Sequence, residues 1–246
     1  MRLVRIAALL ALLVLLPGCF TFPGSGGGPR DYVSSSTYTK WVIEIDYATG
    51  KTPSSDLLSF LDRELEAVVS KPQGVELRLG ESLPNADRTW SDGDVRAFAR
   101  DHASQKTGGD TVVLHLLFLA GRHSDGNVLG VAYGHDLIAI FSDSVNSLCS
   151  GAIVPGTCST APFYRAVVLH ELGHAMGLVN NGIDMVRDHE AKSCAENNPK
   201  GHSANQNSVM TCEVESASAL GQLFGGNPPQ AFDNDDRADL KAAGGK

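Results

Sequence analysis

The sequence HELGHAMGLVN, from His170 to Asn180, is the most specific pattern in this chain. Residues four apart lie one above the other on a helix face, so His170 and His174 can present imidazole nitrogens to a single ion. Glu171 is not needed as a ligand, and its carboxylate can accept a proton from water held on the metal. The pattern therefore predicts a zinc site for metal-assisted hydrolysis, with Glu171 as the general base.

The segments around the motif support a helix that ends abruptly. Pro162 opens the helical pattern, an apolar turn leads into the motif, and the pattern stops after Leu178. Residues 180 to 219 are polar and aperiodic, and a loop-rich stretch of this length in a compact domain is usually functional. Asp233 to Asp236 then give a strong start signal for a short final helix through Lys241.

The first half of the chain alternates predicted strands and helices. Apolar or alternating runs predict strands at 41–47, 75–79, 111–120, 128–133 and 137–141. Helices are predicted from Pro53 to Val68 and from Ser91 to Ser104. The short gap between the last two strands indicates an edge hairpin. His115 lies inside a continuous apolar run, and a histidine in such a position is more often a packed core residue than a ligand.

These elements predict one α+β domain over residues 38–246. We expect a twisted, mostly parallel sheet with an edge hairpin, packed helices that include the metal helix beneath the sheet, and a loop-rich C-terminal half.

The N-terminus resembles a bacterial lipoprotein signal. Arg2 and Arg5 precede an apolar run at 6–16 that is too short to span a bilayer, and Gly18-Cys19 follows. The resemblance implies removal of residues 1–18 and lipidation of Cys19, so that the protein is exported and anchored to a bacterial membrane, facing the periplasm or the cell surface. Ordinary secretory cleavage or a short membrane anchor is the alternative.

Residues 19–37 are rich in Gly, Pro and Ser and predict a flexible tether between the lipid and the domain. Without residues 1–18 the chain has 18 basic and 28 acidic residues, a formal charge of −10. This balance argues against nucleic acid or anionic lipid as a partner. The lipid on Cys19 would then be the attachment to the membrane.

Four further cysteines remain, an even number in a chain predicted to be exported. Three pairings are possible, and closeness in sequence favours Cys149 with Cys158 and Cys194 with Cys212. A structural zinc site is the weaker alternative, because no C-x-x-C spacing occurs.

The motif resembles that of the metzincin endopeptidases, whose pattern is HExxHxxGxxH followed by a methionine turn beneath the metal. His170, Glu171, His174 and Gly177 match it, and Gly177 can take a left-handed conformation that ends the helix. Met210 looks like the residue of the methionine turn. The resemblance is closest to a matrixin-like group of bacterial lipoproteins, and it implies a zincin fold that binds Zn²⁺.

Position 180 departs from that pattern, because Asn180 stands where the family has its third histidine. An amide oxygen is a poor zinc ligand compared with imidazole or carboxylate. We expect His189 to be the third ligand, since the insert at 181–183 could carry the chain around to the ion. The same loop region also offers His202, Asp184, Glu190 and Asn180 itself as candidates.

These features predict a zinc-dependent endopeptidase that acts on protein or peptide substrates at the cell envelope. An extended substrate could add to the edge hairpin as an extra strand. A non-catalytic zinc-binding envelope lipoprotein is the alternative, which Asn180 favours and Glu171 opposes. An amidase acting on cell-wall peptides would share the metal chemistry. Nothing in the sequence predicts the oligomeric state.

Overall fold

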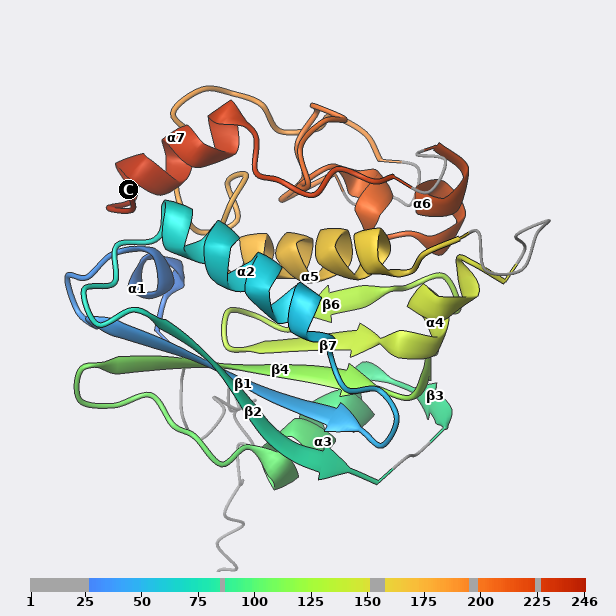
Figure 1. The fold of residues 1–246 in the computed structure, drawn as a ribbon. Coiled ribbons are helices and arrows are strands. Elements are labelled where there is room, and N and C mark those ends of the chain that lie inside the picture. The colour runs from blue at the N-terminus through green and yellow to red at the C-terminus, as the bar shows by residue number, and fades with distance from the viewer. Residues whose placement is uncertain (1–26, 85–86, 151–157, 195–198, 224–226) are drawn as a thin grey trace, which may run out of the picture.

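The computed structural model describes residues 27–84, 87–150, 158–194, 199–223 and 227–246 (Figure 1). The predicted signal at residues 1–18 and Cys19 lie outside these ranges. Five strands form the main sheet in the order β2-β1-β4-β7-β6. Their bounds are Val75–Leu83, Lys40–Ala48, Thr111–Leu119, Leu137–Phe141 and Gly130–Ala132.

The sheet is parallel except at one edge, as predicted. Strands β2, β1, β4 and β7 pair in parallel, and β6 pairs antiparallel with β7. The β6–β7 hairpin therefore leaves β6 as the edge strand. Strand β6 covers only Gly130–Ala132, so it is shorter than the predicted run at 128–133. Two short strands, β3 (Arg88–Trp90) and β5 (Gly121–His123), pair separately.

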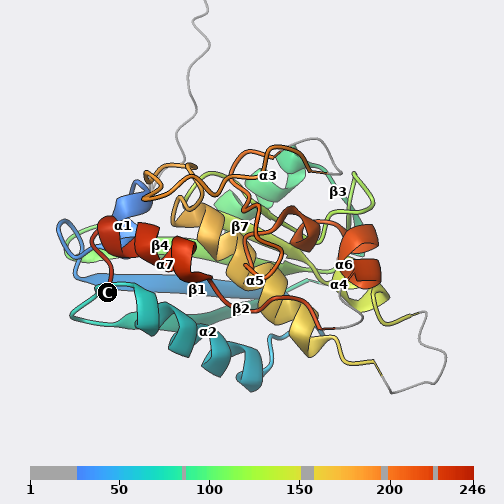
Figure 2. The ribbon, with the colours of Figure 1, turned by 90° about the horizontal axis from the view of Figure 1, so that it is seen from above.

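Helices cover both faces of the sheet (Figure 1). Helix α3 lies on one face, and helices α2 and α5 lie side by side on the other, with α6 and α7 over them (Figures 1 and 2). Three short helices, α1, α4 and η1, complete the set of helices in the described residues. The bounds are α1 Pro29–Val33, α2 Ser55–Val68, α3 Asp92–His102, α4 Ser142–Ser147, α5 Ala161–Ala175, η1 Cys212–Val214, α6 Ala217–Leu223 and α7 Asn234–Ala242.

The helix starts follow the capping signals in the sequence. The Ser54 hydroxyl accepts a hydrogen bond from the Leu57 amide, and Ser91 and Asp94 form a reciprocal capping box on α3. The carboxylate of Asp233 accepts from the amides of residues 235 and 236 at the start of α7. Each cap satisfies amides that the first helical turn leaves without a partner.

Strand β4 separates two apolar cores, which explains its nearly continuous apolar sequence. Leu114, Leu116 and Phe118 belong to the core under α2 and α5, whereas Leu117 and Leu119 belong to the core on the α3 side. Alternate side chains of a strand point to opposite faces, so both faces of β4 must be apolar.

His115 on β4 is a packed core residue. It is 5% exposed, and its Nε2 lies 2.8 Å from Asp46 Oδ2 on the neighbouring strand β1. This contact pairs His115 Nε2 with a buried carboxylate, whereas His115 Nδ1 has no hydrogen-bond partner among the described residues. His115 lies outside the histidine cluster described below.

Helix α5 is buried around its whole circumference over its last ten residues, from Ala166 to Ala175. The sheet lies on one side, α2 packs alongside, and C-terminal segments cover the remaining face (Figures 1 and 2). Ion pairs join α5 and α7 to α2. Arg165 of α5 binds Asp56 of α2 at 2.5 Å, and Arg237 of α7 lies 3.4 Å from Glu64 of α2. The protein thus encloses the motif rather than presenting it on a surface helix.

The folded domain begins earlier than the predicted boundary at residue 38. Tyr32 and Val33 of α1 are fully buried, and the Tyr32 ring packs 5.2 Å from that of Trp41. The Lys71 ammonium donates to the carbonyls of Ser34 and Tyr38, at 2.5 and 2.8 Å. Residues 29–37 are therefore part of the domain, because two large apolar side chains anchor a segment whose composition otherwise suits a tether.

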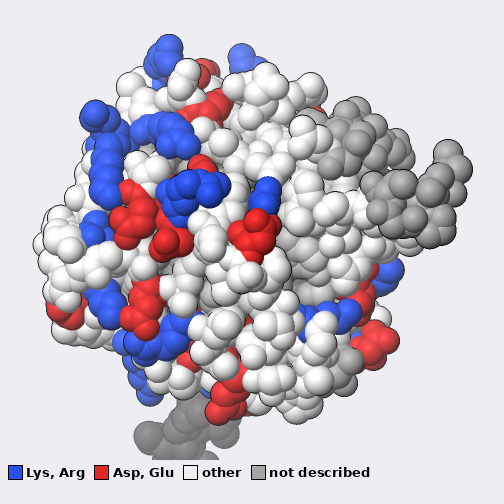
Figure 3. Space-filling view, viewed as in Figure 1, with Lys and Arg blue, Asp and Glu red and all other residues white. Residues whose placement is uncertain are grey.

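On the face seen in Figure 3, basic and acidic side chains are interspersed rather than separated into fields of one sign. In the described residues no helix is both long enough and apolar enough to cross a bilayer.

Candidate metal centre

Helix α5 brings the two motif histidines together as their spacing predicts. The Nε2 atoms of His170 and His174 lie 3.0 Å apart, and the side chains are 0% and 10% exposed. Glu171 is also buried, and its Oε1 has no hydrogen-bond partner among the described residues. A buried carboxylate oxygen without a hydrogen-bond partner in the described part of the chain is suited to accepting a proton.

Gly177 ends the helix with the predicted left-handed conformation, at φ +80°. Its amide donates to the His174 carbonyl at 3.0 Å. A Cβ at this position would lie 2.5 Å from Pro29 Cβ, so α1 also requires glycine here. Val179 and Asn180 continue the turn at φ 53° and 59°.

The structure brings His202, not His189, to the two motif histidines. His202 is 1% exposed, and its ring stacks 5.3 Å from that of His170. His189 instead binds Asp239 of α7, with Nε2 2.9 Å from Oδ2. The expected ligand set is corrected accordingly, because the loop after Asn180 carries His189 towards α7 before it returns to α5.

Asn180, Asp184 and Glu190, the remaining candidate ligands of this loop, lie apart from the cluster. Asn180 is exposed, and the side chain of Asp184 is 96% exposed, 3.7 Å from Arg30. Glu190 accepts a hydrogen bond from the Gly201 amide at 3.2 Å. It therefore helps to place His202 without joining the group itself.

Backbone pairing holds His202 in place. The Ala191 amide donates to the His202 carbonyl at 2.7 Å, and the next residue, Ser203, donates its amide to the Met210 carbonyl at 2.7 Å. Gly201 adopts φ +82°, and a Cβ there would lie 3.3 Å from the His174 ring. Gly201, immediately before His202, thus leaves room for the His174 ring.

Met210 is fully buried and packs against the motif helix at Gly173. A Cβ on Gly173 would overlap its Sδ, so the glycine within HELGH makes room for the methionine. The preceding residue, Val209, accepts a hydrogen bond from His170 Nδ1 at 2.7 Å. A carbonyl can only accept, so Nδ1 carries the proton and Nε2 keeps a lone pair for an ion.

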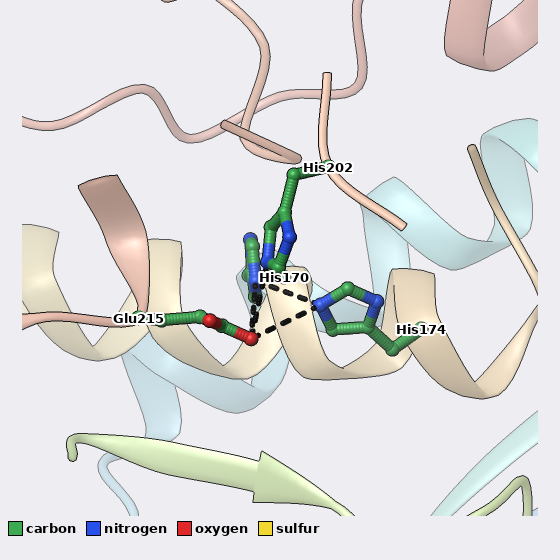
Figure 4. A group of neighbouring side chains, drawn as sticks. All are labelled: His170, His174, His202 and Glu215. Atoms are coloured by element: carbon green, nitrogen blue, oxygen red, sulfur yellow. Dashed lines mark hydrogen bonds and ion pairs between the residues drawn. The ribbon is translucent and has the colours of Figure 1, made fainter. Parts of the chain in front are cut away.

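Glu215 is a member of the site that sequence reasoning missed. It follows η1, and its Oε1 lies 3.8, 3.5 and 3.1 Å from Nε2 of His170, His174 and His202 (Figure 4). Ligand atoms of these four residues all lie within 4.8 Å of one another. No motif marks Glu215, because only the path of the chain after Met210 brings it here.

The electrostatics of the cluster favour a cation at its centre. Burial and the neighbouring His170 lower the pKa of His174 to about 4, which keeps its imidazole neutral. Burial alone would raise the pKa of Glu215, but the three neighbouring imidazoles lower it well below the usual range. Burial and the charge of Glu215 raise the pKa of Glu171. Three imidazole nitrogens with a carboxylate oxygen are a donor set that suits Zn²⁺.

A cleft of about 530 Å³ opens onto the cluster. Glu171, His174, His202 and Glu215 line it together with residues 130–132, which form edge strand β6. The cleft has the size of a small-ligand or peptide site and places β6 beside the candidate metal ligands.

Both predicted disulfides are present. Cys149 bonds to Cys158 and Cys194 to Cys212, with Cα atoms 5.4 and 5.8 Å apart. The second bridge lies at the site, because its sulfur atoms are within 4.8 Å of a ring nitrogen of His202. It ties the loop before His202 to the turn after Met210.

The α+β architecture, with its mostly parallel sheet and packed helices, is a zincin-like fold. Archaemetzincin from Methanopyrus kandleri has a similar crystal structure, with a TM-score of 0.51 and 16% sequence identity over 83% of this chain and 96% of that chain. No protein-family model matches the chain, and no curated protein sequence matches it. The similarity supports the zincin-like fold, and the finer resemblance to a matrixin-like group stays a prediction.

Proposed function

We propose that this protein is a zinc-dependent endopeptidase, with His170, His174 and His202 as metal ligands and Glu171 as the general base. The observation that carries the proposal is the convergence of three buried imidazoles beside a buried carboxylate oxygen without a partner, at a cleft under an edge strand. Histidine nitrogens with an adjacent unliganded glutamate are the parts that zinc-assisted hydrolysis needs.

A bound zinc ion supplies a Lewis acid that polarises a peptide carbonyl and acidifies water. The residues of the chain perform the remaining steps. Glu171 takes the proton of the attacking water and passes it to the leaving amine. The Val209 carbonyl holds His170 in the tautomer that directs Nε2 into the cluster.

We further propose that an extended peptide binds along β6. Among the described residues this strand pairs with β7 alone in the main sheet, so groups on its other edge can form main-chain hydrogen bonds, apart from the Ala132 amide, which bonds to Glu171. Gly130 supports the proposal, because a Cβ there would lie 2.9 Å from Glu171 Oε1. The glycine leaves room between the edge strand and the base.

Export and lipid attachment through Cys19 are part of the proposal. The support is the order of charge, apolar run, glycine and cysteine at the N-terminus. Two disulfides in the domain agree with an oxidising compartment.

One observation favours a second function, a zinc-binding protein without catalysis. Structural zinc sites have four protein ligands, whereas catalytic sites keep one position open. Glu215 offers a fourth donor, so the cluster could be closed. The two functions differ in whether the protein cleaves a peptide bond.

Glu171→Gln tests the proposal. We expect zinc content near one ion per chain and loss of cleavage of an unfolded protein, by about 10²-fold or more, because the general base is gone. Glu81→Gln on β2, an exposed carboxylate at the opposite edge of the sheet, is the control. Full activity in Glu171→Gln would refute Glu171 as the base, and a zinc-loaded wild type without activity would favour the second function.

A further inference from the structure

Four separations among the donor atoms of the cluster are close to those of a tetrahedral zinc site. Zinc bonds to nitrogen and oxygen of about 2.0–2.2 Å place tetrahedral ligands about 3.3–3.6 Å apart. The two motif nitrogens are 3.0 Å apart, and Glu215 Oε1 lies 3.1 to 3.8 Å from the three imidazole nitrogens. Glu215 Oε1 therefore lies at distances from the three imidazole nitrogens that suit a fourth ligand of the same zinc ion.

The backbone of Glu215 is anchored while its carboxylate borders the cleft. The Glu215 amide donates to the Cys212 carbonyl at 3.3 Å, and the Leu129 amide donates to the Glu215 carbonyl at 3.4 Å. The next residue, Ser216, forms a β-bridge with Val128. The Glu215 side chain is nevertheless 42% exposed, compared with at most 10% for the three histidines.

Glu215 thus differs from the three histidines in how far its side chain is exposed. The imidazoles are enclosed by helix and loop, and His170 is fixed further by its hydrogen bond to Val209. The Glu215 carboxylate can turn into the cleft about its own side-chain bonds without movement of the chain. Figure 4 shows it approaching the histidines from the side of the cluster opposite His174.

We propose that Glu215 is a displaceable fourth ligand, which closes the metal site in the substrate-free protein and turns away when a peptide enters the cleft. This inference rests on the proposed function. A displaceable Glu215 makes a four-donor cluster compatible with hydrolysis. The open coordination position that hydrolysis requires then forms only when substrate is present. Glu215 thereby acts as a positioning residue that limits entry of water and small anions to the ion.

The test compares the full chain with Glu215→Gln and Glu215→Ala. Glu213→Gln is the matched control, since Glu213 lies two residues away on the same turn and its carboxylate accepts from the Thr211 hydroxyl instead. Zinc affinity is measured by competition with a chromogenic chelator. The visible spectrum of the cobalt-substituted proteins is recorded with and without azide, a small anionic ligand for an open position.

We expect both Glu215 variants to bind zinc at least about tenfold more weakly than the wild type and Glu213→Gln. Azide should change the cobalt spectrum of the Glu215 variants at concentrations that leave the wild type unchanged. Zinc affinities equal to that of the wild type would overturn the inference and leave the proposed function standing. A wild-type chain that binds no zinc would overturn the proposed function itself.

Discussion

The Nδ1 atom of His170 lies 2.7 Å from the carbonyl oxygen of Val209, which joins the motif helix to the turn that precedes Met210. The two segments also meet at Gly173, where a Cβ would overlap Met210 Sδ. The orientation of a metal ligand thus depends on how closely helix and turn pack. Changes that separate them should act on metal affinity as well as on stability.

Gly173→Ala should therefore weaken zinc binding. The added methyl group collides with a fully buried methionine, which should lower the free energy of unfolding by about 1–3 kcal/mol. Gly93→Ala is the helical control, because a Cβ there meets only Ser91 Oγ at 3.8 Å; it should be neutral or stabilise by up to about 1 kcal/mol. Urea unfolding and zinc titration measure both effects. Unchanged zinc affinity in Gly173→Ala would argue against the coupling.

His202→Ala and His189→Ala should separate metal binding from stability. His202→Ala removes a proposed ligand and should abolish stoichiometric zinc binding. His189→Ala should keep zinc and lose about 1–3 kcal/mol of stability, because the buried Asp239 carboxylate loses its imidazole partner. The zinc content of each purified variant, measured by metal analysis, tests both expectations. Loss of zinc in His189→Ala with zinc retained in His202→Ala would reverse the assignment.

The two disulfides should differ in their effect on the metal. Serine replacement of both Cys194 and Cys212 should lower stability by about 2–4 kcal/mol and weaken zinc binding, since this bridge adjoins His202. Replacement of Cys149 and Cys158 should cost similar stability and leave zinc affinity unchanged. Thermal unfolding and zinc competition give the two readouts. Equal zinc affinity in both double variants would count against a positioning role.

Asp236 should make stability fall as the pH rises from 4 to 7. Burial, together with the charge of Asp233, raises its pKa from 3.8 to about 6 in the folded protein. Between these values the folded state binds more protons than the unfolded state, so its stabilising contribution is complete below about pH 4 and is lost through pH 6. Asp236→Asn cannot titrate at this position. Its free energy of unfolding should therefore rise by about 1–3 kcal/mol relative to that of the wild type over this range. Urea unfolding at pH 4 to 7 measures the difference in the free energy of unfolding between Asp236→Asn and the wild type. This difference should grow as the pH rises, and a constant difference would contradict the prediction.

Local sequence patterns were enough to predict the main elements of the fold. The helix from 161 to 175, the two-sided apolar strand at 111–119 and the edge hairpin depend on periodicity, capping and turn residues that neighbours in sequence supply. The pairing of the cysteines could be predicted for the same reason, since each bridge joins residues close along the chain.

Residues set by the path of a long loop could not be predicted in this way. His189 and His202 both follow Asn180 in aperiodic sequence, and contacts with Asp239 and with residue 210 decide which of them returns to the helix. Glu215 reaches the cluster through backbone pairing with the segment before β6. The short helix at 29–33 was missed because Tyr32 and Val33 stand alone in a Gly- and Ser-rich segment.

An anomalous difference map, recorded at the zinc absorption edge from crystals of the zinc-loaded protein, tests the metal ligands directly. We expect one dominant peak about 2.0–2.1 Å from Nε2 of His170, His174 and His202. A dominant peak beside His189 and Asp239, or at the cysteine sulfurs, or no peak at the three histidines, would contradict this assignment.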